Sequence, residues 1–174
     1  NLDFFDLKGV IEGMAESLRL PALSFEPCVD ETSYHPGKCA VITIGETRLG
    51  VMGELHPRVK ENYDLLGAPV QAAEFDLNAL LAGIPPYYKT DSVPTQPPVL
   101  EDIAVIVDES IPAAQVEAVI RQGGGKMLTN ARLFDIFRGQ QIGEGKKSLA
   151  YSLTYQSADK TLDDKDAAQI RQRI

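Results

Sequence analysis

The sequence predicts an α+β fold divided into two units. Three observations support this prediction: a proline-rich segment near the middle, stretches of apolar–polar alternation typical of half-buried strands, and segments with the apolar spacing of amphipathic helices. The chain has 174 residues, of which 44% are apolar and 24% charged, so it is long enough to bury a substantial core.

The proline-rich segment "PPYYKTDSVPTQPP" covers residues 85–98 and holds five of the eleven prolines. Proline removes a backbone donor and biases the preceding residue toward extended structure, so we predict a stiff linker here. The linker separates a first unit, residues 1–84, from a second unit, residues 99–174.

The first unit is predicted to be a largely antiparallel sheet with helices. Residues 39–45 and 47–55 alternate as two strands joined by a hairpin turn at Gly45 and Glu46. Residues 56–66 predict a short helix with Pro57 in its first turn, and residues 70–77 predict a strand leading into another short helix from Asp76. An opening helix that Pro21 ends has one apolar stripe, formed by Phe4, Leu7, Val10, Ile11, Met14 and Leu18.

The second unit has the predicted order β-α-β-β-α. Its strands are residues 102–109, 131–137 and 148–156, and its first helix is residues 112–122, with Pro112 in the first turn and Gly123–Gly125 as the stop. The last helix, residues 163–174, has Ala167, Ile170 and Ile174 on one face and begins at a cap formed by Thr161 or Asp163.

This order is that of a ferredoxin-like split βαβ sandwich without its last strand. The first residue is Asn1 rather than Met. We therefore expect a piece of a longer polypeptide, truncated before the final strand or continued by a tail.

Composition narrows the class of function. The net charge is −8, with −7 carried by residues 1–94 and −1 by residues 95–174, so a nucleic-acid contact has to be local and lie in the second half. Two cysteines without a CxxC pair predict neither a disulfide framework nor a zinc site, and favour a reduced, cytoplasmic setting. No segment has the roughly 20 apolar residues of a membrane span.

Strand alternation predicts an open sheet face in the second unit. In residues 148–155, Tyr151 and the other large apolar side chains project to one face of the sheet, and Phe134 and Ile136 project to the same face. We expect the two helices to cover this face. The opposite face of the second and third strands carries small residues, one aromatic and one acid, and the first strand adds Asp102, Ala104 and Ile106. The residues of the second and third strands on this face are Asp135, Phe137, Ser148, Ala150, Ser152 and Thr154.

Such a face can receive single-stranded bases, because an aromatic ring stacks on a base while small residues allow close approach. The carboxylate of Asp135 can only accept hydrogen bonds, which suits the N1–H and N2–H₂ donors of guanine. Lys146 and Lys147, in a loop with Gly143 and Gly145, are candidates to contact phosphate. The alternative interpretation is an ordinary solvated face with a surface hairpin loop.

The first unit contains residue pairs that could suggest catalysis. His35 lies four positions before Cys39, and Glu54 lies two before His56. A cysteine–histidine nucleophile needs a third orienting group, and none is identifiable. Pro36 and Pro57 directly follow the histidines, so we favour structural histidines in turns at strand ends. No phosphate-loop spacing is present, and we interpret Gly123–Gly125 as a helix terminator.

Taken in order, several segments resemble the C-terminal part of the bacterial phenylalanine–tRNA ligase β subunit. They are "FFDLKGVIEGM", "YHPGKCA", "GELHP", the proline linker, "DIAVIVDE", "LFDIFRGQQIGEGKKSLAYSLTYQ" and "TLDD". The resemblance covers essentially the whole chain, and the ordered set is far more specific than any single segment.

The resemblance implies an α₂β₂ class II synthetase that joins phenylalanine to tRNA with ATP and magnesium, with the catalytic site in the α subunit. Residues 1–84 would belong to a catalytic-like module that has lost catalysis and packs at the subunit core. The second unit would be the ferredoxin-fold anticodon-binding domain. The sequence has no FRxE-type arginine and no GxGxxR strand, so we expect no catalytic residue, no metal and no cofactor in this fragment, and no activity of its own.

The resemblance also implies base contacts at Ala104, Asp135, Phe137 and Ser148. Position 137 is commonly tyrosine in the family, so Phe137 keeps the stacking ring and lacks the hydroxyl. The family usually has arginine just before Asp102, where this chain has Leu100 and Glu101. We expect a basic tRNA contact to be replaced there by a repulsive charge.

Two other functions remain open at this stage. The acidic balance and the Leu100–Glu101 departure favour a protein-interaction or scaffold module that does not contact RNA. A small hydrolase built on His35 and Cys39 is the remaining alternative.

Overall fold

The computed structural model describes residues 2–65, 67–87 and 94–174 and divides into two units, residues 1–90 and 91–174. The predicted linker, residues 85–98, includes residues 88–93, which lie outside the described residues. Within the described part of the chain, no helix is both long enough and apolar enough to cross a membrane.

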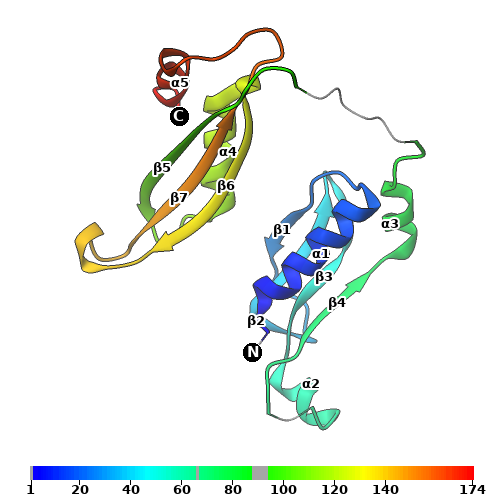
Figure 1. Cartoon of the computed structure of the whole chain (residues 1–174). Coiled ribbons are helices and arrows are strands. Elements are labelled where there is room, and N and C mark those ends of the chain that lie inside the picture. The colour runs from blue at the N-terminus through cyan, green and yellow to red at the C-terminus, as the bar shows by residue number, and fades with distance from the viewer. Residues whose placement is uncertain (1, 66, 88–93) are drawn as a thin grey trace. The chain divides into compact units, whose positions relative to one another are not determined.

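Unit 1 is an antiparallel sheet of four strands with a long helix along one face (Figure 1). The strand order is β1 (Ser24–Pro27), β2 (Tyr34–Ile44), β3 (Thr47–Leu55) and β4 (Gln71–Phe75), and the helix is α1 (Phe4–Leu18). A capping box of Asp3 and Asp6 starts α1, and Arg19 ends it in a left-handed conformation. Ile11 of α1 packs into the core with Ala40, Ile42, Leu49 and Met52.

The structure confirms the predicted hairpin of unit 1, in which Ile44 pairs with Thr47 across Gly45 and Glu46. It also confirms the short helices α2 (Pro57–Asn62) and α3 (Leu77–Gly83). Two expectations were wrong, and one strand was missed. Val10 is exposed rather than part of the buried stripe, Pro36 lies inside β2 at a register shift rather than in a turn, and β1 was not predicted.

Unit 2 has the predicted order of elements. Its strands are β5 (Val99–Asp108), β6 (Leu128–Phe137) and β7 (Lys146–Tyr155), and its helices are α4 (Ala113–Gly124) and α5 (Asp164–Arg171). Short 3₁₀ helices, η1 (Gly125–Met127) and η2 (Gln140–Ile142), lie before β6 and in the β6–β7 loop. The described sheet is antiparallel in the order β5-β7-β6. The core between the sheet and the helices includes Ile120, Leu149, Tyr151, Leu153, Tyr155 and Ile170.

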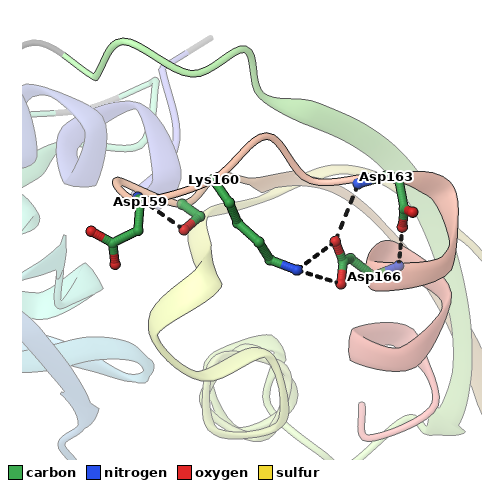
Figure 2. A network of polar contacts seen from close by, with 5 residues as sticks. Asp159, Lys160, Asp163 and Asp166 are labelled. Atoms are coloured by element: carbon green, nitrogen blue, oxygen red, sulfur yellow. Dashed lines mark hydrogen bonds and ion pairs between the residues drawn. The ribbon is translucent and has the colours of Figure 1, made fainter.

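A polar network fixes the start of α5 (Figure 2). The sequence predicted either Thr161 or Asp163 as the cap of this helix. Asp163 is the cap: its side chain accepts from the Asp166 N–H at 2.8 Å, and the Asp166 carboxylate accepts from the Asp163 N–H at 3.3 Å. Lys160 donates to both carboxylate oxygens of Asp166 at 2.8 Å and, together with the Asp163 N–H, lowers the pKa of that carboxyl.

The sequence predicted that Gly123–Gly125 terminate the helix, but two of these glycines lie inside α4 and have a packing role. The helix continues through Gly124, and Gly125, with φ +59°, is the residue that ends it. A Cβ on Gly124 would lie 2.5 Å from Leu128 Cβ, and a Cβ on Gly123 would lie 2.7 Å from the Arg173 carbonyl oxygen. The missing side chains therefore allow close packing of α4 against the start of β6 and the end of the chain.

We predict that Gly124→Ala destabilises unit 2, although alanine favours helix. The backbone at Gly124 is ordinary right-handed helix, with φ −70° and ψ −27°, so the cost is the overlap with Leu128 alone. We expect a loss of about 1–3 kcal/mol, measured by urea unfolding of the chain.

Gly13→Ala is the matched control, because Gly13 is also in a helix and its added Cβ would meet nothing within 4 Å. This variant should gain about 0.5–1 kcal/mol from helix propensity. Equal effects of the two substitutions would show that the α4–β6 contact is not close-packed.

Candidate nucleic-acid interface

The four residues predicted to contact bases lie in two neighbouring rows across the sheet of unit 2. Ala104 pairs with Ala150, which pairs with Asp135, and in the next row Ile106 pairs with Ser148, which pairs with Phe137. Residues directly opposite one another in an antiparallel sheet project to the same face. The alternate residues of β7, from Leu149 to Tyr155, are fully buried against the helices, so both rows lie on the uncovered face. We call this uncovered side the open face.

The two residues with the most specific proposed roles are accessible. Asp135 is exposed, and its carboxylate makes no hydrogen bond or ion pair with any residue that the structure describes. Phe137 is 44% exposed, and a Cβ on Gly139 would come within 2.8 Å of its ring, so the loop backbone lies directly against that ring. The open face thus presents two groups that are two positions apart on β6. They are the unpaired carboxylate of Asp135 and the ring of Phe137, which lies against the loop backbone.

The prediction for Phe134 was wrong. Leu133 pairs with Tyr151, but Asp135 pairs with the very next residue of β7, Ala150, so β6 contains one extra residue at a β-bulge. Leu133 packs in the core, whereas Phe134 is 51% exposed and is not part of the core. The bulge breaks the period of two and frees Phe134 from the covered face.

Phe134 borders a hollow of about 390 Å³ on the open face, beyond Asp135 as seen from Phe137. The sequence did not single out this group. Alternation had placed Asp102 and Ser152 on the open face, but extended back from Asp135 it would put Leu133 and Ala131 there. Arg132 shares the face of Asp135 only because of the bulge, which leaves no sequence signal. The lining residues are Asp102, Asn130, Arg132, Phe134 and Ser152.

Glu109 ties the β6–β7 loop to the end of β5. Its carboxylate accepts from the Arg138 guanidinium at 2.8–3.1 Å, its N–H donates to the Gly145 carbonyl at 2.8 Å, and its carbonyl accepts from Lys147 Nζ at 2.8 Å. The Arg138 pair lowers the pKa of the Glu109 carboxyl. These contacts fix the loop.

The two lysines proposed for phosphate contact are therefore in different environments. Lys147 is only 8% exposed, pairs with Val107 on the covered face and uses its ammonium to hold Glu109, which removes it from the phosphate candidates. Lys146 pairs with Asp108, is exposed, and lines a depression with Gly143 and Gly145. Its phosphate contact remains a prediction.

The expected repulsive charge at Glu101 does not face the open side. Glu101 pairs with Leu153 on the covered face, and its carboxylate accepts a hydrogen bond from Arg171 of α5. Its second oxygen and the Tyr155 hydroxyl are buried without hydrogen-bond partners among the described residues. Burial raises the pKa of Tyr155, and the nearby Glu101 carboxylate raises it further. The departure on the open face is Leu100, which is 70% exposed.

The candidate catalytic pairs of unit 1 have structural partners. Cys39 is buried, and burial together with the Cys28 thiol raises its pKa to about 11, which suppresses the nucleophilic thiolate. His35 Nδ1 accepts from the Gly37 N–H at 3.1 Å rather than from a thiol. Glu54 pairs with Lys38 at 2.5 Å. His56 caps α2 by accepting from the Arg58 N–H at 3.2 Å.

Metal ligands do not gather in the part of the chain that the structure describes: no group of three or more His, Cys, Asp or Glu side chains there could hold an ion.

Family models match both units. Residues 1–77 match the phenylalanyl-tRNA synthetase beta chain CLM domain, and residues 94–174 match the ferredoxin-fold anticodon binding domain. The chain belongs to the phenylalanine–tRNA ligase β-subunit family.

The chain is similar to proteins named phenylalanine–tRNA ligase beta subunit from several bacteria. It is 42% identical over 174 residues to that of Clostridium acetobutylicum, covering 100% of the chain and 22% of the relative. It is 40% identical over 172 residues to that of Symbiobacterium thermophilum, covering 99% of the chain and 19% of the relative. It is 35% identical over 173 residues to that of Clostridium tetani, covering 99% of the chain and 22% of the relative. The chain thus spans about a fifth of the length of these β subunits.

We predict that amine acylation distinguishes the two adjacent lysines of this β-subunit unit. In the folded chain, Lys146 should react readily, whereas Lys147 should be protected because its ammonium is buried against the Glu109 carbonyl. Peptide mass spectrometry after brief acylation at neutral pH measures this difference. In urea both lysines should react alike, and equal reactivity in the folded chain would contradict the assignment of Lys147 to the covered face.

Proposed function

We propose that this chain is part of the β subunit of an α₂β₂ phenylalanine–tRNA ligase, and that unit 2 binds the anticodon of tRNA-Phe through its open face. The observation that carries the proposal is the pair of rows that brings Ala104, Asp135, Phe137 and Ser148 together on the uncovered side of one sheet. The relatives carry the ligase name, and the family model of unit 2 carries the anticodon-binding description.

The chemistry of the open face supports recognition of guanine. The unpaired Asp135 carboxylate can accept from both N1–H and N2–H₂ of a guanine edge, whereas adenine offers an acceptor at N1. Phe137 stacks on a base, and the small side chains of Ala104 and Ser148 leave room for it. Lys146 contacts a phosphate beside the loop. A guanine is expected at the first position of a phenylalanine anticodon.

Unit 1 is proposed to be a non-catalytic, class II-like module that packs against other parts of the α₂β₂ enzyme. Apolar side chains on the outer sides of its helices support this role: Phe5 and Val10 of α1 are 72% and 69% exposed, and Leu77 and Leu81 of α3 are 67% and 62% exposed. ATP and magnesium would act in the holoenzyme, at the active site of the α subunit.

The second candidate function is a protein-interaction module that does not contact RNA. The exposed apolar residues Leu100 and Ile106, at 70% and 55% exposure, favour it, because both project from the edge strand β5 on the open face. The tRNA experiments below separate the two candidates.

We predict that Asp135→Ala in the full α₂β₂ enzyme weakens discrimination between tRNA-Phe with guanine and tRNA-Phe with adenine at the first anticodon position. Loss of base-edge hydrogen bonds costs about 1–3 kcal/mol, so the ratio of kcat/KM for the two tRNAs should fall about 5- to 150-fold. Aminoacylation assays with the two transcripts measure the ratio.

Asp159→Ala is the charge-matched control, since Asp159 belongs to the same unit but lies in the loop before α5 (Figure 2). It should leave the ratio unchanged, and both variants should activate phenylalanine as the unmodified enzyme does. Unchanged discrimination in Asp135→Ala would show that this carboxylate is only a surface acid.

We also predict that the chain alone neither activates phenylalanine nor charges tRNA. The sequence lacks the FRxE-type arginine and the GxGxxR strand that bind ATP in a class II active site. ATP–pyrophosphate exchange and aminoacylation should both stay at background with the purified chain, and should appear only with the complete enzyme.

A further inference from the structure

We propose that the open face holds a second nucleotide beside the first, in the hollow bordered by Phe134 and Arg132. This inference rests on the proposed function, because it assigns the hollow to the nucleotide next to the one that Asp135 and Phe137 receive. The base stacks on Phe134, and Arg132 contacts the phosphate.

The bulge in β6 provides the stacking surface. Because one extra residue separates Leu133 from Asp135, Phe134 leaves the core side and becomes half-exposed beside the hollow. Phe137 lies two rows along the sheet from the row of Arg132, on the other side of Asp135. The open face therefore has two aromatic rings with an unpaired carboxylate between them, which is an arrangement for two bases rather than one.

Arg132 provides the charge that the hollow needs for an RNA backbone. It is exposed and makes no ion pair or hydrogen bond with a described residue. Other arginines of unit 2 are engaged: Arg121 with Glu117, Arg138 with Glu109 and Arg171 with Glu101. An uncommitted guanidinium beside an aromatic ring suits a phosphate or a base plane.

The spacing of the rows matches neighbouring nucleotides rather than one extended ligand. The hollow is bordered by the row of Asp102, Ser152 and Arg132, which follows the row of Ala104, Ala150 and Asp135. Successive rows on one face lie about 7 Å apart, since each strand residue rises about 3.4 Å. The volume of about 390 Å³ falls within the range of small-molecule sites.

The polar groups of the hollow can hydrogen-bond the edge of a base. Asp102 offers only acceptors, and Ser152 and Asn130 can donate or accept. Adenine, guanine and cytosine can donate to Asp102 through an exocyclic amino group, and uracil can donate to it through N3–H. The hollow can therefore hydrogen-bond the edge of any of the four bases.

The test couples protein and RNA changes. Binding of the α₂β₂ enzyme to the anticodon stem–loop of tRNA-Phe is measured by fluorescence anisotropy for Phe134→Ala, Phe137→Ala and the unmodified protein. Each is tested with the intact RNA, with an abasic site at the first anticodon position, and with an abasic site at either neighbouring nucleotide. Val119→Ala, an exposed apolar change on α4, is the control.

Phe134→Ala should weaken binding of the intact RNA about 5- to 150-fold, the range expected for one base–aromatic stack. The loss should disappear with an abasic site at one neighbouring nucleotide, and persist with an abasic site at the first position.

Arg132→Gln gives an independent measurement. It should lower the slope of log affinity against log salt by about 0.7, the value for one contact to a single strand, whereas Lys165→Gln on α5 should not change the slope. Circular dichroism checks that each variant is folded.

The outcomes separate the two proposals. If only Phe137→Ala couples to an abasic site, the second nucleotide site is overturned and the proposed function stands. If neither phenylalanine couples to any nucleotide, anticodon binding by the open face fails, and this inference fails with it.

Discussion

The strict alternation of β7 is the constraint on which the rest of unit 2 depends. Leu149, Tyr151, Leu153 and Tyr155 are all 0% exposed, and β7 is the central strand, paired on both sides. A slip of one residue would move these side chains to the open face, at a cost of roughly 1.5–3 kcal/mol for each large apolar side chain. The register of β7 is therefore fixed, and it sets which residues of β5 and β6 face outward.

The same constraint decides where helices and site residues lie. Tyr151 donates from its buried hydroxyl to the Ala113 carbonyl at 2.9 Å, which joins the strand to the start of α4. Ser148 and Ala150, the neighbours of Leu149 on β7, are small and face the other way. The large side chains of the covered face thus stabilise the fold. The small side chains of the open face leave room for a flat base to approach.

Much of this arrangement could be predicted from the sequence, because alternation and helical spacing are local signals. The order of elements in unit 2, the cap region of α5 and the face shared by Ala104, Asp135, Phe137 and Ser148 follow from such patterns. The bulge at Phe134 could not be predicted, because it depends on how β6 matches the fixed register of β7. Alternation gave one face for Phe134 and Ile136, and the pairing of Asp135 with Ala150 overrides it.

Contacts between distant residues account for the other corrections. Nothing near Lys147 in the sequence indicates that its ammonium bonds to the carbonyl of Glu109, thirty-eight positions earlier. Glu101 is neutralised by Arg171, seventy positions later. Both side chains are drawn to the covered face by strand register, and there a charge needs a partner because burial without one is costly. Local patterns identify the charges, and only the fold identifies their partners.

These pairings explain how an acidic chain can offer a surface for RNA. In unit 2, Arg121, Arg138, Lys147, Lys160 and Arg171 are engaged by acidic side chains or a carbonyl, so the net charge says little about the open face. Arg132 and Lys146 remain there without described partners, three rows apart and so about 20 Å from each other along β7. Phe137 and the Asp135 carboxylate lie between them. Phosphates are thus attracted at the two ends of this series of rows, while the Asp135 carboxylate in the middle repels any backbone and favours base edges that donate hydrogen bonds.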